Sequence, residues 1–175
     1  MGNGIIVCGL NGAGKSTLGK ALAKKLSFYF IDNEDLYFPK NDPNYLYSSP
    51  RTHEEAEKLL AAEIQTHGNF VFASVKGDYC KNIISQFHYA IWLHVPKDIR
   101  IQRVKKRSFQ KFGSRMMPGG DLYEKEKNFF DFVESRPEDT IEKWLKSARC
   151  SVIHVDGTRT TEEMIDMILK QIPGF

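Results

Sequence analysis

A glycine-rich run near the start of the chain has the residue types and the spacing needed to bind phosphate. Residues 9–17 read Gly-Leu-Asn-Gly-Ala-Gly-Lys-Ser-Thr, which fits the pattern G-x-x-x-x-G-K-[ST]. Glycines let successive backbone N–H groups converge on phosphate oxygens at the start of a helix. The Lys15 ammonium would reach the terminal phosphates, and the Ser16 hydroxyl would ligate Mg²⁺. The run predicts a nucleoside triphosphate site with these contacts: Asn11, Gly12, Ala13, Gly14, Lys15, Ser16 and Thr17.

Acidic residues follow the second apolar run of the chain. Asp32 and Asp35 come after residues 28–31, which read as a strand. Phosphoryl transfer to a hydroxyl uses one carboxylate near Mg²⁺ and another that orients the hydroxyl and accepts its proton. Open α/β sheets bind ligands at the carboxyl ends of their strands, so the position is suitable. The alternative is that Asp32 and Asn33 cap a helix beginning at Glu34.

Short apolar runs alternate with helical patterns along the chain, and these elements must position the chemical groups. The runs lack a regular polar alternation, as expected for strands covered on both faces. Repeated strand-then-helix units predict a three-layer α/β domain with a parallel sheet and helices on both of its faces. We expect strands at 4–8, 28–31, 70–73, 90–95 and 151–155, and helices at 15–26, 52–66, 79–86, 97–111, 121–134, 137–147 and 161–171.

The composition indicates a single globular domain over residues 1–175. Hydrophobic residues make up 41% of the chain and charged residues 27%, which are ordinary values for a globular protein. No apolar run reaches the roughly 20 residues of a membrane span, and we expect no signal peptide before the first strand. The three cysteines are scattered and lack metal-ligand spacing. We therefore expect a cytoplasmic protein, with no membrane or protein partner implied.

The net charge of +3 hides an uneven distribution of basic residues. They concentrate between Lys97 and Arg115, a stretch that could bind nucleic acid. The chain already has a phosphate site that needs counter-charge, so nucleic acid is the less favoured partner. Arg103 and Arg107 stand four residues apart and share one helix face. The alternative is a solvated basic face with no ligand.

The complete phosphate loop, the small α/β body and this Arg-rich segment resemble the nucleoside-monophosphate-kinase superfamily of P-loop kinases, which includes adenylate, shikimate and gluconate kinases. The resemblance implies a P-loop NTPase fold with a five-stranded parallel sheet in the order 2-3-1-4-5 and a small lid. It also implies ATP with Mg²⁺, and transfer of the γ-phosphoryl group to a small acceptor. On this basis we expect the acceptor-binding region at 37–67 and the lid at 103–121.

Two segments take roles from this resemblance. A similar R-x-x-x-R stands at the lid entrance of adenylate kinases, which implies that Arg103 packs on adenine and that Arg107 contacts phosphates. Arginine suits both roles, because its planar group stacks on rings and bridges phosphate oxygens. Similar Asp-Gly-Thr turns in the superfamily imply that Gly157 and Thr158 place backbone groups against adenine.

The acceptor segments depart from true adenylate kinases, which carry a Thr-Gly-Asp turn after the second strand. Residues 30–39 are closer to shikimate and gluconate kinases, whose second strand ends in Asp-x-Asp. By this resemblance Asp32 belongs to the metal shell, and Asp35 orients the acceptor hydroxyl. Several cations around one cleft would suit an anionic acceptor, and the candidates are Arg51, Lys76, Arg115 and Arg136.

Glycines and Pro118 surround Arg115, as in a hinged catalytic lid, although a rigid loop with a surface arginine is an equal alternative.

Aromatic residues at helical spacing, on the other hand, indicate core packing rather than a ligand stack. This second set consists of Phe129, Phe130, Phe132 and Trp144.

The sequence as a whole predicts an ATP-dependent kinase of a small molecule, with an anionic hydroxyl compound as the acceptor. One alternative is a nucleoside-monophosphate kinase of the adenylate type. An alternative of another class is a regulatory NTP-binding switch or NTPase. The chain lacks the Asn-Lys-x-Asp motif that specifies GTP, which argues against the switch.

Overall fold

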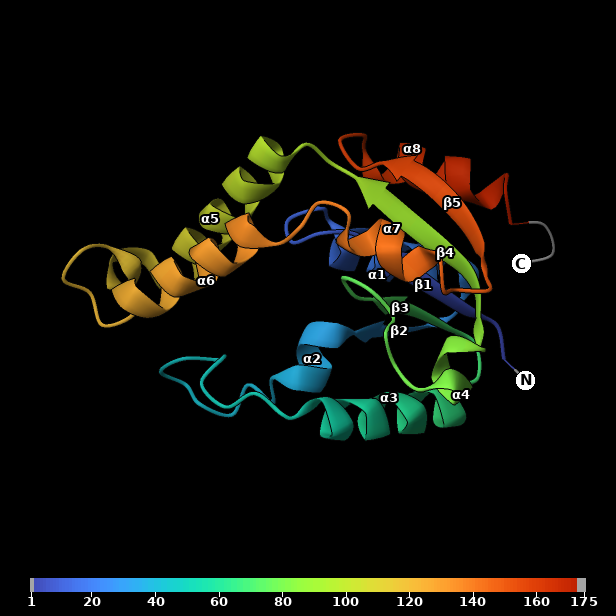
Figure 1. Ribbon diagram of the computed structural model, residues 1–175, viewed down its shortest axis with the longest axis horizontal. Helices are drawn as coiled ribbons and strands as arrows, with labels where there is room; N and C mark the ends of the chain where they lie inside the picture. Colours follow the sequence, from blue (N-terminus) through green and yellow to red (C-terminus); the bar gives the residue numbers. More distant parts are fainter. Residues whose placement is uncertain (1, 173–175) are drawn as a thin grey trace.

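The computed structural model describes residues 2–172 and arranges them in three layers around one sheet (Figure 1). Its five strands are parallel and lie in the order β2-β3-β1-β4-β5. The predicted fold class and strand order are therefore confirmed. The strands are β1 (Gly4–Cys8), β2 (Tyr29–Asp32), β3 (Phe70–Ala73), β4 (Phe87–His94) and β5 (Ser151–Asp156).

Helices cover both faces of the sheet, as the strand-then-helix alternation predicts. On one face lie α1 (Lys15–Leu26) and α8 (Thr161–Leu169). On the other lie α3 (His53–His67), α4 (Lys81–Ile84) and α7 (Thr140–Leu145). None of the helices within residues 2–172 is long and apolar enough to cross a membrane.

The central strand shows why the apolar runs lack a polar alternation. Ile5 and Val7 point into the core beneath α1 and α8, whereas Ile6 and Cys8 point into the core beneath the opposite helices. All four side chains are fully buried. A strand covered on both faces must be apolar on both, so each of these four residues is part of one of two cores.

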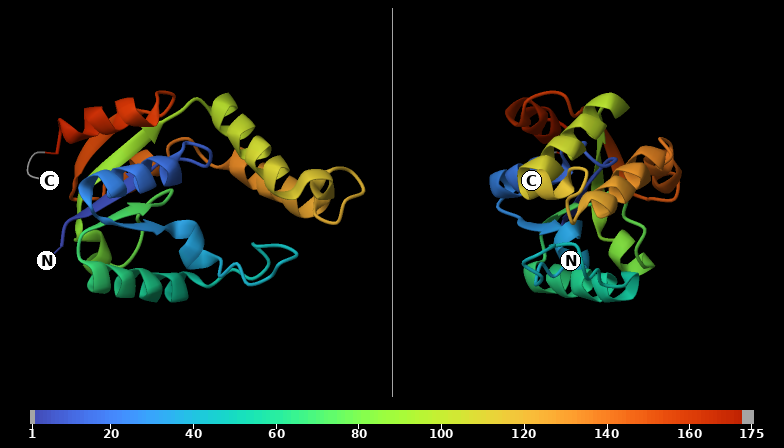
Figure 2. Two further views of the ribbon diagram at one scale, coloured as in Figure 1. Left: turned by 180° about the vertical axis from the view of Figure 1, so that it is seen from behind. Right: turned by 90° about the vertical axis from the view of Figure 1, so that its left-hand side faces the viewer.

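Two segments extend beyond the carboxyl ends of the strands (Figure 2). One is an arm made of α5 (Lys97–Phe112), the 3₁₀ turn Gly113–Met116 and α6 (Tyr123–Ser135), in which the two helices pack side by side. The other is the loop 38–52, which follows the short helix α2 (Asn33–Tyr37). Both segments extend from the edge of the sheet that carries the phosphate loop.

The element boundaries differ from the sequence predictions in a few places. Helix α2 is a single turn. It is absent from the helices predicted above, where a helix beginning at Glu34 was given only as an alternative. Strand β4 begins three residues early, at Phe87, because Phe87 pairs with Gly4 across a register shift. The predicted helices 79–86 and 137–147 are shorter, and Thr140 instead begins its helix after a turn closed by the Pro137 carbonyl.

The phosphate loop is packed tightly against the start of α5. Gly12 has a φ of +82°, and a Cβ added there would lie 2.2 Å from the Arg100 carbonyl oxygen. Gly14 also has a positive φ, +96°, but a Cβ there would meet nothing within 4 Å. A left-handed backbone conformation favours glycine at both positions. Only at Gly12 does the close approach of the Arg100 carbonyl also exclude a side chain.

We therefore expect Gly12→Ala to destabilise the protein more than Gly14→Ala. Backbone strain should cost about 1–2 kcal/mol in each variant, and overpacking should add about 1–3 kcal/mol in Gly12→Ala. Urea denaturation with an unchanged m-value would measure both losses. Equal free energies of unfolding for the two variants would contradict the close packing of the loop on α5.

Candidate active site

The phosphate loop joins β1 to α1 in the geometry that its sequence predicts. Gly14 is the N-cap of α1 in a left-handed conformation, and no side chain caps the helix. The Ala13 N–H donates to the Leu10 carbonyl at 3.1 Å and closes the turn. A helix N-terminus without a side-chain cap, preceded by a glycine-rich turn, is a ready anion site.

Lys15 lies beside this turn with its ammonium held by the backbone. Its Nζ donates to the Leu10 carbonyl oxygen at 3.3 Å. Burial, together with the positive charge of Arg107, lowers the pKa of Lys15 from its usual 10.5 to about 8. Asp32 acts in the opposite direction and stabilises the charged form. An anion would therefore stabilise the Lys15 ammonium more than the Leu10 carbonyl oxygen does.

A cavity of about 560 Å³ lies between the phosphate loop, the arm and the loop 38–52. The phosphate loop contributes Asn11, Gly12, Lys15 and Ser16 to its wall. The remaining wall comes from the strand ends, from α2 with its following loop, and from the arm: Asp32, Asn33, Glu34, Tyr37, Phe38, Tyr45, Tyr47, Ala73, Ser74, Val75, Arg107, Ser108, Lys111, Glu126, Phe129, Phe132 and Arg136.

The acidic residues at the end of β2 and in α2 divide into two that line the cavity, Asp32 and Glu34, and one that does not. Asp32 caps α2, because its Oδ1 accepts from the Glu34 N–H at 3.0 Å, and it also lines the cavity. The capping alternative from the sequence is thus confirmed for Asp32, although the helix begins at Asn33. Asp35 is 62% exposed and pairs with Lys40 outside the cavity.

Glu34 is a cavity residue that sequence reasoning missed. Its Oε1 accepts from the Tyr47 hydroxyl at 3.1 Å and lies 3.7 Å from the Lys111 ammonium. The signal that could have found it is the Asp-x-Asp spacing of shikimate and gluconate kinases, because Glu34 stands two residues after Asp32. The role predicted for Asp35 stays a prediction.

The two arginines of α5 that the sequence predicts as nucleotide contacts, Arg103 and Arg107, lie near other predicted contacts. A guanidinium N–H of Arg103 donates to the Gly157 carbonyl at 3.2 Å, so these two predicted adenine contacts are adjacent. Thr158 is held in the same turn, where its N–H and hydroxyl both donate to Asp156. Arg107 lines the cavity near Lys15.

Three other predicted site residues lie outside the cavity wall. Arg51 donates to the Leu36 carbonyl at 2.8 Å and so ties the loop 38–52 to α2. Lys76 pairs with Asp78 at 2.7 Å. Arg115 forms a two-point ion pair with Asp121 across the tip of the arm, with a shortest distance of 2.6 Å. Their roles at the acceptor or on a lid stay predictions.

The aromatic set on α6 and α7 is only partly core, which corrects the sequence interpretation. Trp144 is 7% exposed and belongs to the core. Phe132 is 55% exposed, and both Phe129 and Phe132 line the cavity. Phe129 and Phe132 stand three residues apart and share one face of α6, but α6 lies in the arm, beyond the sheet, so this face covers the cavity instead of the core. Phe130 is not part of the cavity wall, and Lys105 lies over its ring.

Two charged side chains of the cavity wall retain unpaired atoms. Glu126 is 1% exposed, and its Oε2 has no hydrogen-bond partner among the described residues. The Arg136 Nε is likewise buried without a partner in residues 2–172, and burial lowers the pKa of this guanidinium. The Glu126 position carried no motif that sequence reasoning could have recognised.

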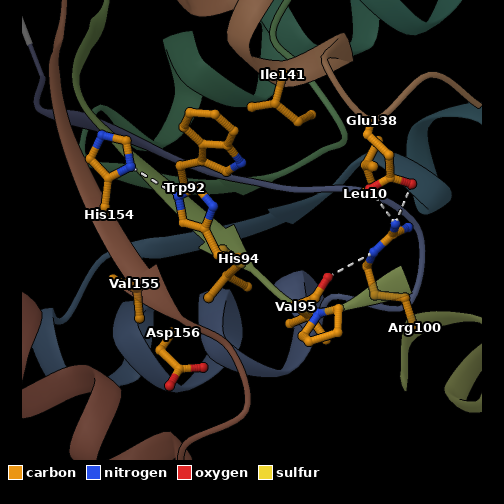
Figure 3. Close-up of a pocket in the computed structure, with 12 residues that line it drawn as sticks. Leu10, Trp92, His94, Val95, Arg100, Glu138, Ile141, His154, Val155 and Asp156 are labelled. Carbon is orange, nitrogen blue, oxygen red and sulfur yellow. Dashed lines mark hydrogen bonds and ion pairs between the residues drawn. The ribbon is translucent and has the colours of Figure 1, made fainter. Parts of the chain in front are cut away.

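A second cavity, of about 530 Å³, lies against β4 and β5 (Figure 3). His94 Nε2 and His154 Nδ1 share a hydrogen bond of 2.9 Å there, and burial lowers the pKa of His94. Arg100 donates to the Val95 carbonyl and to both carboxylate oxygens of Glu138. These polar groups bond one another, so the second cavity offers little to a charged ligand.

Comparison with known proteins places the chain in a family. A model of the AAA domain family matches residues 5–115. The uncharacterized protein YqaC of Bacillus subtilis is 27% identical over 97% of both chains, and the shikimate kinase of Enterococcus faecalis is 24% identical over 96% of this chain and 97% of its own. The crystal structure of shikimate kinase from Bacteroides thetaiotaomicron matches with a TM-score of 0.61 at 16% identity over 97% of each chain. The chain belongs to the AAA domain family and is a P-loop kinase of the nucleoside-monophosphate-kinase-like superfamily.

Proposed function

We propose that this protein transfers the γ-phosphoryl group of Mg-ATP to the hydroxyl of a small anionic acceptor, as its shikimate kinase relatives suggest. The observation that carries the proposal is one cavity lined by both the phosphate loop and a set of acidic and basic side chains. The phosphate loop would hold ATP at one end. The acceptor would enter between the proposed acceptor region, 37–67, and the proposed lid, 103–121.

The residues at the phosphate end fit a magnesium-bound triphosphate. Ser16 and Asp32 both line the cavity and offer oxygen ligands, which Mg²⁺ prefers. Magnesium would neutralise charge on the phosphate oxygens when bound. Lys15 and the backbone N–H groups of the loop would orient the phosphates, and Arg107 would stabilise charge that develops during transfer.

The other charges support a hydroxyl acceptor that is itself anionic. Glu34 lines the cavity, where it could orient a hydroxyl and accept its proton, which is the role that the sequence assigned to Asp35. Arg136 has a buried Nε without a described partner. The Arg136 guanidinium is half-buried over the Phe132 ring, and an anion would stabilise such a cation, so we propose that the acidic group of the acceptor lies against Arg136.

A phosphate acceptor is the second candidate, as in nucleoside-monophosphate kinases. One observation favours it: the Asp35 carboxylate lies outside the cavity. A phosphate oxygen needs no strong base, so the absence of Asp35 from the wall would have no effect on such an acceptor. An NTPase without an acceptor would instead hydrolyse ATP at one rate whatever compound is added.

The pKa of Lys15 predicts a pH-dependent affinity for ATP. Bound phosphate favours the charged ammonium, so affinity should be highest below pH 8 and should fall as Lys15 loses its proton above it. For a group that titrates near 8, the fall should be about fivefold between pH 8 and pH 9. Calorimetry at several pH values, in buffers of different ionisation enthalpy, would also detect the proton taken up.

The matched variant is Lys15→Ala, with Lys20→Ala on an exposed position of the same helix as the control. Lys15→Ala should bind ATP weakly with no such pH dependence, and should lose several powers of ten in turnover. If the wild type and Lys15→Ala shared one pH profile, Lys15 would not be the titrating group.

Replacing Arg103 or Arg107 with alanine should change different kinetic parameters. Arg103→Ala removes a base contact, so it should chiefly raise the KM for ATP. Arg107→Ala removes a charge from the transfer step, so it should chiefly lower kcat. Steady-state kinetics would measure both, with the exposed Lys106→Ala as the control. Kinetics equal to those of the control would indicate a solvated basic face.

The acceptor base can be located by comparing two neighbouring acids. We expect Glu34→Gln to reduce acceptor-dependent turnover roughly a hundredfold, the usual scale of general-base catalysis, while ATP affinity stays unchanged. Asp35→Asn, at the exposed neighbour, should stay within about tenfold of the wild type. If Asp35→Asn lost turnover and Glu34→Gln did not, Asp35 would be the acceptor base. Normal turnover in both variants would favour a phosphate acceptor.

A further inference from the structure

A side-chain amide in the wall of the cavity beside the phosphate loop is held by a buried tyrosine. Asn33, a residue of α2, lines this cavity, and its Oδ1 accepts from the Tyr79 hydroxyl at 2.5 Å. The other amide atom, Nδ2, has no hydrogen-bond partner in residues 2–172, and it does not belong to the buried unpaired atoms of this part of the chain. The amide oxygen is therefore occupied, while two N–H donors keep accessible surface.

Tyr79 is a rigid support for this amide. It is 7% exposed and belongs to the core beneath α3, α4 and α7. Its ring packs edge-on against Phe72, with centroids 5.8 Å apart, and stacks on His53 at 5.1 Å. Burial raises the pKa of the Tyr79 hydroxyl far above its usual value of 10, so the group keeps its proton. A flip of the Asn33 amide would take the oxygen acceptor away from this buried donor, which is costly.

The neighbours of Asn33 indicate what its free donors can bind. Asp32 and Glu34 stand on either side of it in the chain, and all three residues line the cavity. Two carboxylates would repel an anion bound at Asn33, whereas an amide N–H donates to oxygen without adding charge. An oxygen bound there would therefore be neutral, as in a hydroxyl or a carbonyl. The acidic group of the acceptor has its proposed place at Arg136 instead.

We propose that Asn33 determines acceptor specificity by donating from Nδ2 to a neutral oxygen of the acceptor, beside the hydroxyl that Glu34 orients. Tyr79 is the positioning residue, which acts through Asn33 by holding the amide with its donors toward the acceptor. This inference rests on the proposed function, because it describes a second contact to the acceptor of the same phosphoryl transfer.

The orientation of the amide can be tested without any acceptor. The side-chain ¹⁵N relaxation of Asn33 would be measured by NMR, with its resonance assigned by its loss in Asn33→Asp. We expect an order parameter above about 0.6 in the wild type and below it in Tyr79→Phe, which lacks the hydroxyl donor. The control is Tyr29→Phe, the same change at a residue of β2 that is 40% exposed and lies outside the cavity wall.

The contact to the acceptor is tested by ADP release from ATP with shikimate, gluconate and glycerate. With the most active of these compounds, Asn33→Ala should raise the acceptor KM about tenfold and Tyr79→Phe about 3- to 10-fold. The kcat should change less than about threefold, and the KM for ATP should not change. Asn33→Asp, which keeps the bond from Tyr79 but loses the donors, should raise the acceptor KM at least as much as Asn33→Ala. Asn82→Ala, at an exposed position of α4, is the control.

Two cycles distinguish this contact from a purely structural effect. The double variant of Asn33→Ala and Tyr79→Phe should have the acceptor KM of Asn33→Ala alone, because Tyr79 acts only through the amide. The second cycle changes the acceptor, by using the analogue that lacks the hydroxyl next to the reacting one. With this analogue, the wild type and Asn33→Ala should share one KM, since the oxygen that Asn33 would contact is gone.

Several results would overturn the inference. Acceptor-dependent ADP release with an unchanged acceptor KM in Asn33→Ala would reject the contact and leave the proposed function standing. An equally ordered amide in the wild type and in Tyr79→Phe would remove the role of Tyr79. If no compound raised ADP release, the proposed transfer would fail for this panel, and calorimetry with a non-hydrolysable ATP analogue would decide the rest. Binding that Asn33→Ala weakens would support the site, whereas binding of no compound, or binding that Asn33→Ala leaves unchanged, would reject it.

Discussion

The close contact between the phosphate loop and the start of α5 determines the geometry of the site. The Arg100 carbonyl oxygen leaves no room for a side chain at Gly12. The Arg100 side chain, 3% exposed, bonds the Val95 carbonyl at the end of β4 and Glu138 beyond α6. One residue thus connects the loop, the sheet and both ends of the arm. Arg107 lies two helical turns further along α5, so its distance from the phosphates is set by this junction.

The cavity has two chemically distinct ends because it is built from two kinds of element. At the phosphate end, the backbone of a strand, a turn and a helix N-terminus supply fixed dipoles, and Lys15 adds a charge. At the far end, α2, the loop 38–52 and the arm supply side chains, of which Glu34, Tyr47 and Lys111 form one bonded group. The first end recognises a feature common to all nucleoside triphosphates. The second can vary with the acceptor without disturbing the sheet.

The sequence predicts the phosphate end well and the acceptor end poorly, for a physical reason. The phosphate loop is a local pattern, and the strands are apolar because the sheet is covered on both faces. By contrast, successive residues of a helix point about 100° apart, so a step of one residue along α2 separates Glu34 in the wall from Asp35 in solvent. An apolar helix face also looks the same whether it covers a core or a cavity, which is why Phe132 was interpreted as core. Glu126 belongs to no motif, so only its burial reveals it.

Three charged groups in this cavity are held in states that cost stability. Burial lowers the pKa of Lys15 to about 8, Arg136 has a buried Nε without a described partner, and Glu126 has an unpaired oxygen. An anionic ligand group would relieve the two cations. Because Lys15 and Arg136 repel each other, an anion bound near one also stabilises the other. Two substrates that bring anions to the same end of the cavity would be favoured by these cations and opposed by their mutual repulsion. In the proposed transfer both would be held only while these cations remain charged, and Lys15, Arg107 and Arg136 carry such charges in the cavity wall.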